Sequence, residues 1–266
     1  INYRMEVIMI KAIFFDIDGT LLSHTCCHVP ESTLKALEML KQNGIKTFIA
    51  SGRHASEMKK LPLNIDDFEG FVTLNGQYCY NNERVIYDLP IDKGDLMAMV
   101  EDIKQNRYPC IFVEEDRMYI NYNDDYVQMV QDAISTPLPE IGDINRVGER
   151  EIYQLIPYVT AEQEEHILSL MPNSLPTRWH ELAIDIIPAK GGKQNGIRKM
   201  IEYYNIPREE IMAIGDGEND LDVMEFAGIS VAMGNAVPSV KAAADYVTDD
   251  VDHDGIYNAL KHFNLI

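Results

Sequence analysis

The sequence predicts an α/β fold in which a Rossmann-like parallel-sheet core carries an inserted α+β domain. Three observations predict it. Strand-like and helix-like stretches alternate near both ends of the chain, as they do in βαβ units. Between those ends, hairpins are mixed with helices, which is typical of an antiparallel sheet. The chain has 266 residues, which is enough for one large domain or two smaller ones.

The first part of the chain has the pattern of two βαβ units. Strands are predicted over residues 10–17, 45–51 and 70–76, and helices over 30–44 and directly after Arg53. The first helix is predicted because Leu34, Leu37 and Leu40 recur at helical spacing, and Gly44 is expected to end it.

The pattern changes near Gly76, where the inserted domain is expected to begin. Hairpins are predicted over 77–88 and 109–122, the second turning at 115–117, and strand-like stretches follow over 151–159 and 177–187. Helices are predicted over 92–107, 126–134 and 161–171.

The last part of the chain returns to the first pattern. Helices are predicted over 193–206, 219–228, 238–244 and 254–263, and strands over 209–217, 229–234 and 245–248. The simplest topology is a discontinuous core domain, residues 1–80 and 189–266, with residues 81–188 inserted as a second domain.

The composition is that of a globular protein with an acidic surface. Apolar residues make up 46% of the chain, charged residues 25%, and the formal net charge is −20. This charge argues against nucleic-acid binding, which usually needs a basic patch, and against binding to anionic membranes. An anionic substrate would need local cations at its site. Both a monomer and a dimer are compatible with the sequence.

The cysteines and apolar runs indicate a cytoplasmic protein. Cys26, Cys27, Cys79 and Cys110 lack the CxxC spacing of zinc and redox sites, so reduced thiols are expected. No apolar run approaches the roughly 20 residues that span a membrane. Charged residues interrupt residues 1–15, which makes a secretory signal peptide a poor interpretation.

Two carboxylates end the first predicted strand. Asp16 and Asp18 are separated only by Ile17, and residues i and i+2 of an extended chain point to the same side. The two charges repel each other, and burial penalises both. A plain turn would not need both acids directly after a buried strand. A calcium-binding EF-hand loop would need Gly at position six and Glu at position twelve, where Leu21 and Cys27 stand.

Two further segments offer donors for an anion. Ser51, Gly52 and Arg53 form a strand-to-helix turn whose hydroxyl and N–H groups can bind an oxyanion, although an ordinary loop has the same composition. Lys193 stands at a predicted helix start, where the helix dipole disfavours a cation, so a bound anion or a carboxylate partner is indicated. Lys190 is the competing candidate, and the GxxxxGK[ST] phosphate loop is absent.

A fourth segment offers oxygen ligands. Asp216, Asn219 and Asp220 share one turn after a predicted strand, and such oxygens suit a hard cation such as Mg²⁺. A helix N-cap would explain only one of the three residues. Since ligands bind outside the carboxyl ends of parallel strands, the four segments are expected to meet. Acids around a divalent cation, with donors for an anion beside them, describe a phosphoryl-transfer centre.

The segments DIDGT, SGR, Lys193 and GDGEND occur in the order and spacing of the four motifs of the haloacid dehalogenase (HAD) superfamily of phosphohydrolases. The chain resembles the Cof-like subfamily with a type IIB cap, and within it the Bacteroides-type sugar phosphatases. The segments TLNG (73–76) and GISVAMGNAVPSVKAAADYVT (228–248) share the resemblance. One departure is Gln194, where the family more often has glycine.

The resemblance implies a role for each motif residue. Asp16 would be the nucleophile that forms an aspartyl-phosphate, and Asp18 the general acid and base. Mg²⁺ would be held by Asp16, the backbone carbonyl of Asp18, and Asp216. The phosphoryl oxygens would be held by Ser51, Gly52, Lys193, Asn219 and the N–H of Ile17. Supporting roles would fall to Thr20, Arg53 and Asp220.

The resulting prediction is a Mg²⁺-dependent phosphatase of small phosphomonoesters, with sugar phosphates as the expected class. The inserted domain would contact the leaving group, and the candidates are Glu114, Arg178, Trp179 and His180, which could equally be ordinary residues of that domain. Two alternatives stay open: a phosphomutase, and a receiver-like module whose aspartate is phosphorylated without turnover.

Overall fold

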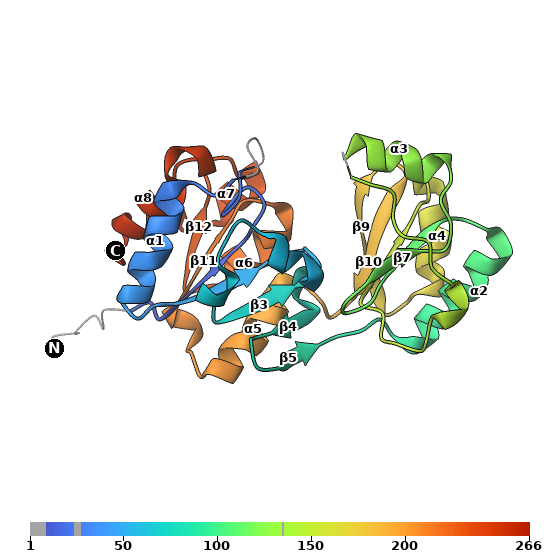
Figure 1. Cartoon of the computed structure of the whole chain (residues 1–266), viewed down its shortest axis with the longest axis horizontal. Coiled ribbons are helices and arrows are strands. Elements are labelled where there is room, and N and C mark those ends of the chain that lie inside the picture. The colour runs from blue at the N-terminus through green and yellow to red at the C-terminus, as the bar shows by residue number, and fades with distance from the viewer. Residues whose placement is uncertain (1–8, 24–27, 135) are drawn as a thin grey trace. The chain divides into compact units, whose positions relative to one another are not determined.

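The computed structural model describes residues 9–23, 28–134 and 136–266, and the chain divides into two compact units (Figure 1). The first unit holds the chain up to Arg53 together with Glu57–Asp88 and Gly192–Ile266. The second holds His54–Ser56 and Leu89–Gly191. Cys26 and Cys27 lie outside the described residues, while Cys79 and Cys110 are buried free thiols, as expected for reduced cysteines.

The first unit is built on an eight-stranded sheet of order β13-β12-β11-β1-β2-β3-β4-β5. Its strands are β1 (Ala12–Phe15), β2 (Lys46–Ala50), β3 (Gly70–Thr73), β4 (Tyr78–Tyr80), β5 (Val85–Asp88), β11 (Ile211–Gly215), β12 (Ile229–Ala232) and β13 (Tyr246–Val247). The strands from β13 to β3 run parallel to their neighbours, which confirms the predicted parallel-sheet α/β fold. The hairpin β4–β5 adds an antiparallel edge. The predicted insert begins at residue 81, whereas this sheet continues to Asp88.

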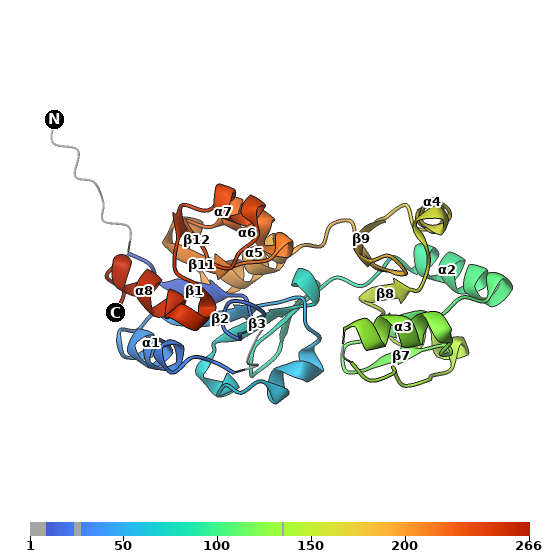
Figure 2. The same ribbon diagram turned by 90° about the horizontal axis from the view of Figure 1, so that it is seen from above.

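Helices cover both faces of this sheet (Figure 2). They are α1 (Glu31–Gln42), α5 (Lys193–Tyr204), α6 (Leu221–Phe226), α7 (Pro238–Ala243) and α8 (Gly255–His262). Side chains alternate along β1, so Ile13 and Phe15 pack in the cluster with α1 and α8, while Ala12 and Phe14 pack in the cluster with α5 and α6. β1 is therefore buried on both sides, as strands of parallel sheets are.

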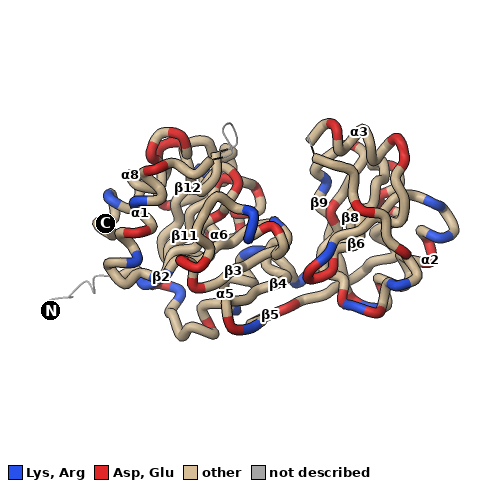
Figure 3. The backbone as a smooth tube through the Cα atoms, viewed as in Figure 1, with Lys and Arg blue, Asp and Glu red and all other residues tan. Residues whose placement is uncertain are grey.

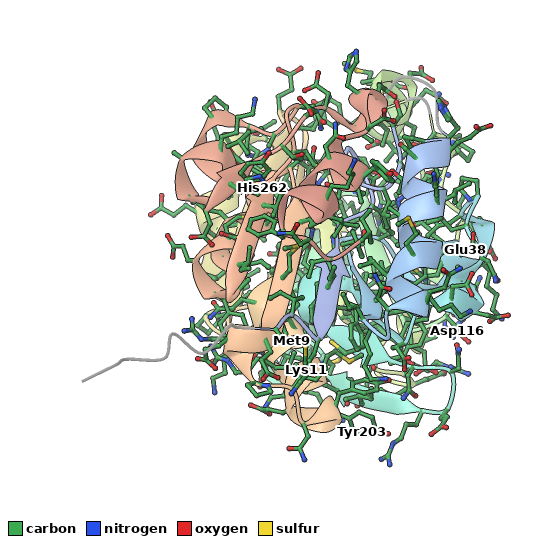
Figure 4. All side chains as sticks on the ribbon, turned by 90° about the vertical axis from the view of Figure 1, so that its left-hand side faces the viewer. Met9, Lys11, Glu38, Asp116, Tyr203 and His262 are labelled. Carbon is green, nitrogen blue, oxygen red and sulfur yellow. The ribbon has the colours of Figure 1, made fainter. Side chains whose placement is uncertain are left out.

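The buried face of α1 differs from the predicted one only at Leu34. Thr33, Ala36 and Leu40 face the core, whereas Leu34 is 43% exposed. Leu40 is fully buried and Leu37 packs against the same core, so two of the three leucines at helical spacing lie on the core side. Figure 4 looks onto this helix, with Glu38 on its outer side.

The second unit is an α+β arrangement, as predicted. Its antiparallel sheet has the order β7-β6-β8-β10-β9. The strands are β6 (Cys110–Val113), β7 (Met118–Ile120), β8 (Gln154–Pro157), β9 (Ser174–His180) and β10 (Ala183–Pro188), and the helices are α2 (Lys93–Asn106), α3 (Asp125–Ala133) and α4 (Ala161–Leu170). Leu96 and Ile103 of α2, Ile167 of α4, and Phe112 and Leu155 of the sheet share one core.

Short 3₁₀ helices complete the described chain. They span Ala55–Lys60, Ile65–Asp67, Leu74–Gly76, Ile144–Arg146, Arg208–Glu210, Glu218–Asp220 and Val251–His253. The short helix predicted after Arg53 is therefore of the 3₁₀ type. No helix among the described residues is long and apolar enough to cross a membrane. Asp and Glu are distributed through both units (Figure 3), in keeping with the net charge of −20.

Candidate active site

The carboxyl ends of three neighbouring parallel strands bring most of the predicted site residues to one edge of the first unit's sheet. β1 ends at Phe15 just before Asp16, β2 ends at Ala50 just before Ser51, and β11 ends at Gly215 just before Asp216. Met9 and Lys11, labelled in Figure 4, mark the other end of β1. These residues therefore lie together at the carboxyl ends of parallel strands, where ligands are expected to bind; we call this expectation the strand-end rule.

Lys193 lies at the centre of the acidic groups. Its side chain is fully buried, and its Nζ donates to Asp16 Oδ1 at 2.6 Å and to Asp220 Oδ1 at 2.7 Å. These are short, charge-assisted bonds. They supply the carboxylate partners that its place at the start of α5 indicated. Lys190, the competing candidate, is exposed and belongs to the second unit.

Asp216 is fixed from two sides. Thr20 Oγ1 donates to Asp216 Oδ1 at 3.0 Å, which gives Thr20 a contact suited to its predicted supporting role. Asn235 Nδ2 donates to Asp216 Oδ2 at 3.3 Å and to the carbonyl of Gly19 at 2.8 Å. The N–H of Val251 donates to Asn235 Oδ1 at 2.9 Å and sets the orientation of this amide.

Asn235 was not among the predicted site residues, although it lies within the segment GISVAMGNAVPSVKAAADYVT (228–248). The signal was available, because Asn235 follows β12 (Ile229–Ala232), which lies next to β11 in the parallel sheet. The strand-end rule applied to β12 selects it in the same way as it selects Asp16 and Asp216.

Burial dominates the electrostatics of Asp16. It raises the pKa of Asp16 to about 7, against the opposing charge of Lys193, and the neighbouring carboxylates Asp220 and Asp216 add to the rise. Burial by itself would lower the pKa of Lys193, but the charges of Asp16 and Asp220 outweigh it and raise that pKa, so the lysine stays a cation. A buried cation paired with crowded acids is an arrangement found at functional sites.

The acidic residues fit a divalent cation. Asp16, Asp216 and Asp220 each offer a carboxylate oxygen, and these oxygens lie within 4.8 Å of one another. Three carboxylates and the single ammonium of Lys193 leave two negative charges, which one Mg²⁺ would balance. Carboxylate oxygens are the ligands that Mg²⁺ prefers.

The three acids are not equivalent as ligands. Asp220 Oδ1 accepts from Lys193, and its Oδ2 accepts the backbone N–H groups of Asp216 and Gly217 at 3.1 and 3.2 Å. Asp220 thus accepts from a cation and from two backbone N–H groups, whereas each oxygen of Asp216 accepts from one neutral side chain, and this difference suits the supporting role predicted for Asp220. Asp16 and Asp216 are the better candidates for direct ligands.

Asp18 is held apart from that cluster by Arg53. Arg53 Nε donates to Asp18 Oδ2 at 2.8 Å, and its Nη2 donates to Asp18 Oδ1 at 2.6 Å. This two-point contact fixes the plane of the carboxylate as well as its position. The carboxylate of Asp18 is therefore not among the clustered acids, and the resemblance assigns only its backbone carbonyl to the metal.

The predicted anion-binding residues occupy the same unit. Ser51 is buried and its Oγ accepts the N–H of Arg53 at 3.1 Å, and Ile17 is buried between the two aspartates. Gly52 and Asn219 both lie against Asn75, a residue of the TLNG segment for which no role was predicted.

All four leaving-group candidates have partners within the second unit. Glu114 is buried and paired with Arg146 at 3.2 Å. Arg178 pairs with Glu164 at 2.7 Å, and the N–H of Leu182 donates to His180 Nδ1 at 3.1 Å. Glu114 and Arg178 thus make contacts that stabilise their own unit.

Trp179 keeps an exposed ring. Its indole Nε1 donates to Asp185 Oδ1 at 2.7 Å, and the residue is 39% exposed. An indole ring of this kind offers an apolar face to a ligand while its polar edge is satisfied.

Asp185 should make stability depend on pH. Burial raises its pKa from 3.8 to about 6, against the hydrogen bonds from Trp179 and Gln154. The folded protein then binds an extra proton between these values, so stability falls as the pH rises through that window. We expect Asp185→Asn to raise the melting temperature at pH 7 by about 2–5 °C and to have no effect near pH 4.

Thermal unfolding of the Asp185→Asn variant from pH 4 to pH 8 measures this effect. Asp66→Asn, at an exposed aspartate of the first unit, is the control and should follow the wild type at every pH. A lower melting temperature for Asp185→Asn at pH 7 would show that the carboxylate stabilises the fold.

Known proteins resemble this chain over nearly its full length. Residues 13–260 match the family model described as haloacid dehalogenase-like hydrolase. YkrA of Bacillus subtilis, provisionally named a phosphatase, is 37% identical over 257 residues, which are 96% of this chain and 98% of YkrA. The HAD subclass IIB sugar phosphatase BT4131 is 37% identical, with a TM-score of 0.81 over 96% of this chain and 100% of that chain. The phosphatase BT1666 from Bacteroides thetaiotaomicron is 35% identical, with a TM-score of 0.87 over 98% of each chain.

Proposed function

The chain belongs to the haloacid dehalogenase-like hydrolase family and is a phosphatase of it, and on this premise we propose that it is a Mg²⁺-dependent hydrolase of small phosphomonoesters. The resemblance drawn from its four motifs is confirmed. The observation that carries the proposal is the buried Lys193 between Asp16 and Asp220, with Asp216 beside them. The three acids outnumber the single cation, so negative charge remains that a bound metal ion would balance. The ammonium of Lys193 can also donate to an anion.

The metal is proposed to bind Asp16, the backbone carbonyl of Asp18, and Asp216. When bound, Mg²⁺ would offset the negative charge of the acids and of the phosphoryl oxygens. Thr20 and Asn235 hold the two oxygens of Asp216, so this ligand is oriented by the protein itself. Such partners of ligand side chains commonly tune metal affinity.

The reaction is proposed to run through an aspartyl-phosphate. A carboxylate oxygen of Asp16 attacks phosphorus, a new O–P bond forms, and the bond from phosphorus to the alcohol oxygen breaks. Asp18 gives its proton to the departing alcohol. Water then attacks the phosphoryl group and gives a proton to Asp18, which releases inorganic phosphate and restores Asp16. Ser51, Gly52, Lys193, Asn219 and the N–H of Ile17 hold the phosphoryl oxygens in both steps.

We expect Asp18→Asn to lower kcat by about 10²–10⁴-fold for an alkyl phosphate, because an amide cannot donate this proton. The loss should be smaller for p-nitrophenyl phosphate, whose leaving group departs without protonation. Phosphate release from both esters measures the difference. An equal loss on the two esters would contradict a role in protonating the leaving group and would leave Asp18 only a role common to both esters, in the hydrolytic step or in positioning.

Sugar phosphates are the proposed substrate class. The similarity to BT4131, a sugar phosphatase by name, supports this class. In the second unit, the exposed ring of Trp179 is the feature best suited to a sugar face, while Glu114, Arg178 and His180 stay weaker candidates. A cytoplasmic location is proposed from the reduced cysteines expected of the sequence.

A panel of phosphorylated metabolites tests the proposal. Each compound is incubated with the protein and Mg²⁺, and phosphate release is ranked by kcat/KM, with chelator-treated protein in parallel. Isomerised sugar phosphate without phosphate release would instead identify a phosphomutase. A long-lived phosphoryl-Asp16 without turnover would identify a receiver-like module. Activity that is unchanged by the chelator would contradict the metal requirement.

A further inference from the structure

The turn after β3 has an unusual backbone. Leu74, Asn75 and Gly76 have φ values of 51°, 52° and 92°, so three consecutive residues are left-handed. Glycine adopts this region freely and asparagine tolerates it, but leucine does so at a cost in free energy. Local strain of this kind persists where the surrounding structure holds it, and it clusters at functional sites. The residues that this turn contacts therefore indicate which site its strained backbone conformation serves.

The backbone of the turn joins two of the segments proposed to hold phosphate. The N–H of Leu74 donates to the carbonyl of Arg53, and the N–H of Asn75 donates to the carbonyl of Ser51, both at 3.1 Å. On the other side, the N–H of Gly192 donates to the carbonyl of Asn75 at 3.1 Å, directly before Lys193 and α5. The turn thus sets the distance between the Ser51–Gly52 loop and the start of α5.

The approach to α5 is close enough to require glycine. A Cβ on Gly76 would lie 2.1 Å from the carbonyl oxygen of Gly192, and one on Gly196 would lie 2.7 Å from the Cα of Gly76. No ordinary side chain fits at either place. The strained turn is therefore pressed against the helix that begins with Lys193.

The side chain of Asn75 reaches the remaining proposed phosphate-binding residues. Asn219 Nδ2 donates to Asn75 Oδ1 at 3.0 Å. A Cβ on Gly52 would lie only 3.0 Å from that same oxygen, so the Asn75 amide lies directly against Gly52. Asn75 consequently contacts or adjoins Ser51, Gly52, Asn219 and the start of α5.

We infer that Asn75 is a positioning residue for the phosphate-binding groups, an inference that rests on the proposed function. Its Oδ1 accepts one of the two hydrogens on Asn219 Nδ2 and fixes the plane of that amide, which leaves the second hydrogen for a phosphoryl oxygen. Asparagine suits this position because it combines tolerance of the left-handed region with a side-chain acceptor.

The test is a double-mutant cycle on the full chain. Asn75→Gly keeps a backbone that accepts positive φ and removes the acceptor. We expect it to weaken the binding of inorganic phosphate, titrated calorimetrically with Mg²⁺ present, about 5- to 10-fold. In an Asn219→Ala background the same change should weaken phosphate binding less than about 2-fold, because the partner of Asn75 is already absent. If Asn75 had a merely structural role, Asn75→Gly would weaken phosphate binding equally in the two backgrounds.

Asn205→Gly is the matched control. Asn205 is also left-handed, with φ of 57°, but it caps the far end of α5. This variant should bind phosphate as the wild type does, and thermal unfolding should show all variants folded. Phosphate affinity of Asn75→Gly within about 2-fold of Asn205→Gly would overturn the inference.

The two proposals can fail separately. If the wild type hydrolyses phosphomonoesters while Asn75→Gly binds phosphate normally, only the inference is wrong. If no ester is hydrolysed but phosphate binding shows the expected non-additive cycle, Asn75 positions an anion site and the proposed function is wrong.

Discussion

Replacing Asp16 with asparagine should abolish turnover, with kcat lower by at least about 10⁴-fold on every phosphomonoester that the wild type hydrolyses. The amide of asparagine has nearly the same shape as the carboxylate but is not a nucleophile. Loss of activity is therefore expected without loss of the fold. Burial raises the pKa of Asp16, so the charged form is costly in the folded protein, and a neutral amide at this position should not lower the melting temperature greatly.

Two measurements check this expectation. Phosphate release gives kcat, and acid quenching after incubation with a radiolabelled phosphate ester shows whether the label is covalently bound to the protein. The wild type should carry label and Asp16→Asn should carry none, whereas Asp66→Asn should behave as the wild type. Equal activity of the wild type and Asp16→Asn, or inactivity of both on every ester, would sink the proposed mechanism.

Much of the first unit's fold could be predicted because its signals are local. Apolar runs, helical spacing and glycine stops give the type and order of its elements. The edge of its sheet could not be predicted in the same way. The pairing of β4 with β3 places the β4–β5 hairpin in this sheet. The amino-acid composition of these segments does not indicate which strand the hairpin pairs with. The exposed Leu34 has a similar cause, since two faces of α1 carry helical spacing and packing chooses between them.

The strand-end rule predicted the part of the candidate site that directly follows parallel strands. It brought Asp16, Ser51 and Asp216 together because parallel strands share one carboxyl edge. The place of Asn235 after β12 indicates it by the same rule, but the contacts that give Asn75 and Asn235 their roles are side-chain bonds to residues far away in the sequence. Asn219 and Asn75 are 144 residues apart, and Asn235 and Gly19 are 216 residues apart. Only the folded chain shows these contacts.

Lys193→Ala should lower both stability and activity, whereas Lys190→Ala should change neither. The ammonium of Lys193 is fully buried, and it balances Asp16 and Asp220 at 2.6 and 2.7 Å. Breaking a buried pair by removing one partner typically costs about 3–5 kcal/mol. If Lys193 is the charged donor to the phosphoryl group that we propose, its loss should also lower kcat by about 10²–10³-fold. Lys190 is exposed and should tolerate alanine.

The stability loss of Lys193→Ala should depend on pH in a definite direction. Lys193 is the charge that opposes the rise in the pKa of Asp16, so its removal raises that pKa further above the unfolded value. The folded variant then takes up protons as the pH falls, and it regains stability relative to the wild type between about pH 8 and pH 5. Urea unfolding in the presence of a metal chelator at these two pH values measures the change. Lys193→Met, which fills more of the space without a charge, separates the lost charge from the cavity that alanine leaves. A deficit of the same size at both pH values in both variants would mean that Lys193 stabilises the fold through packing, and that the buried acids do not depend on its charge.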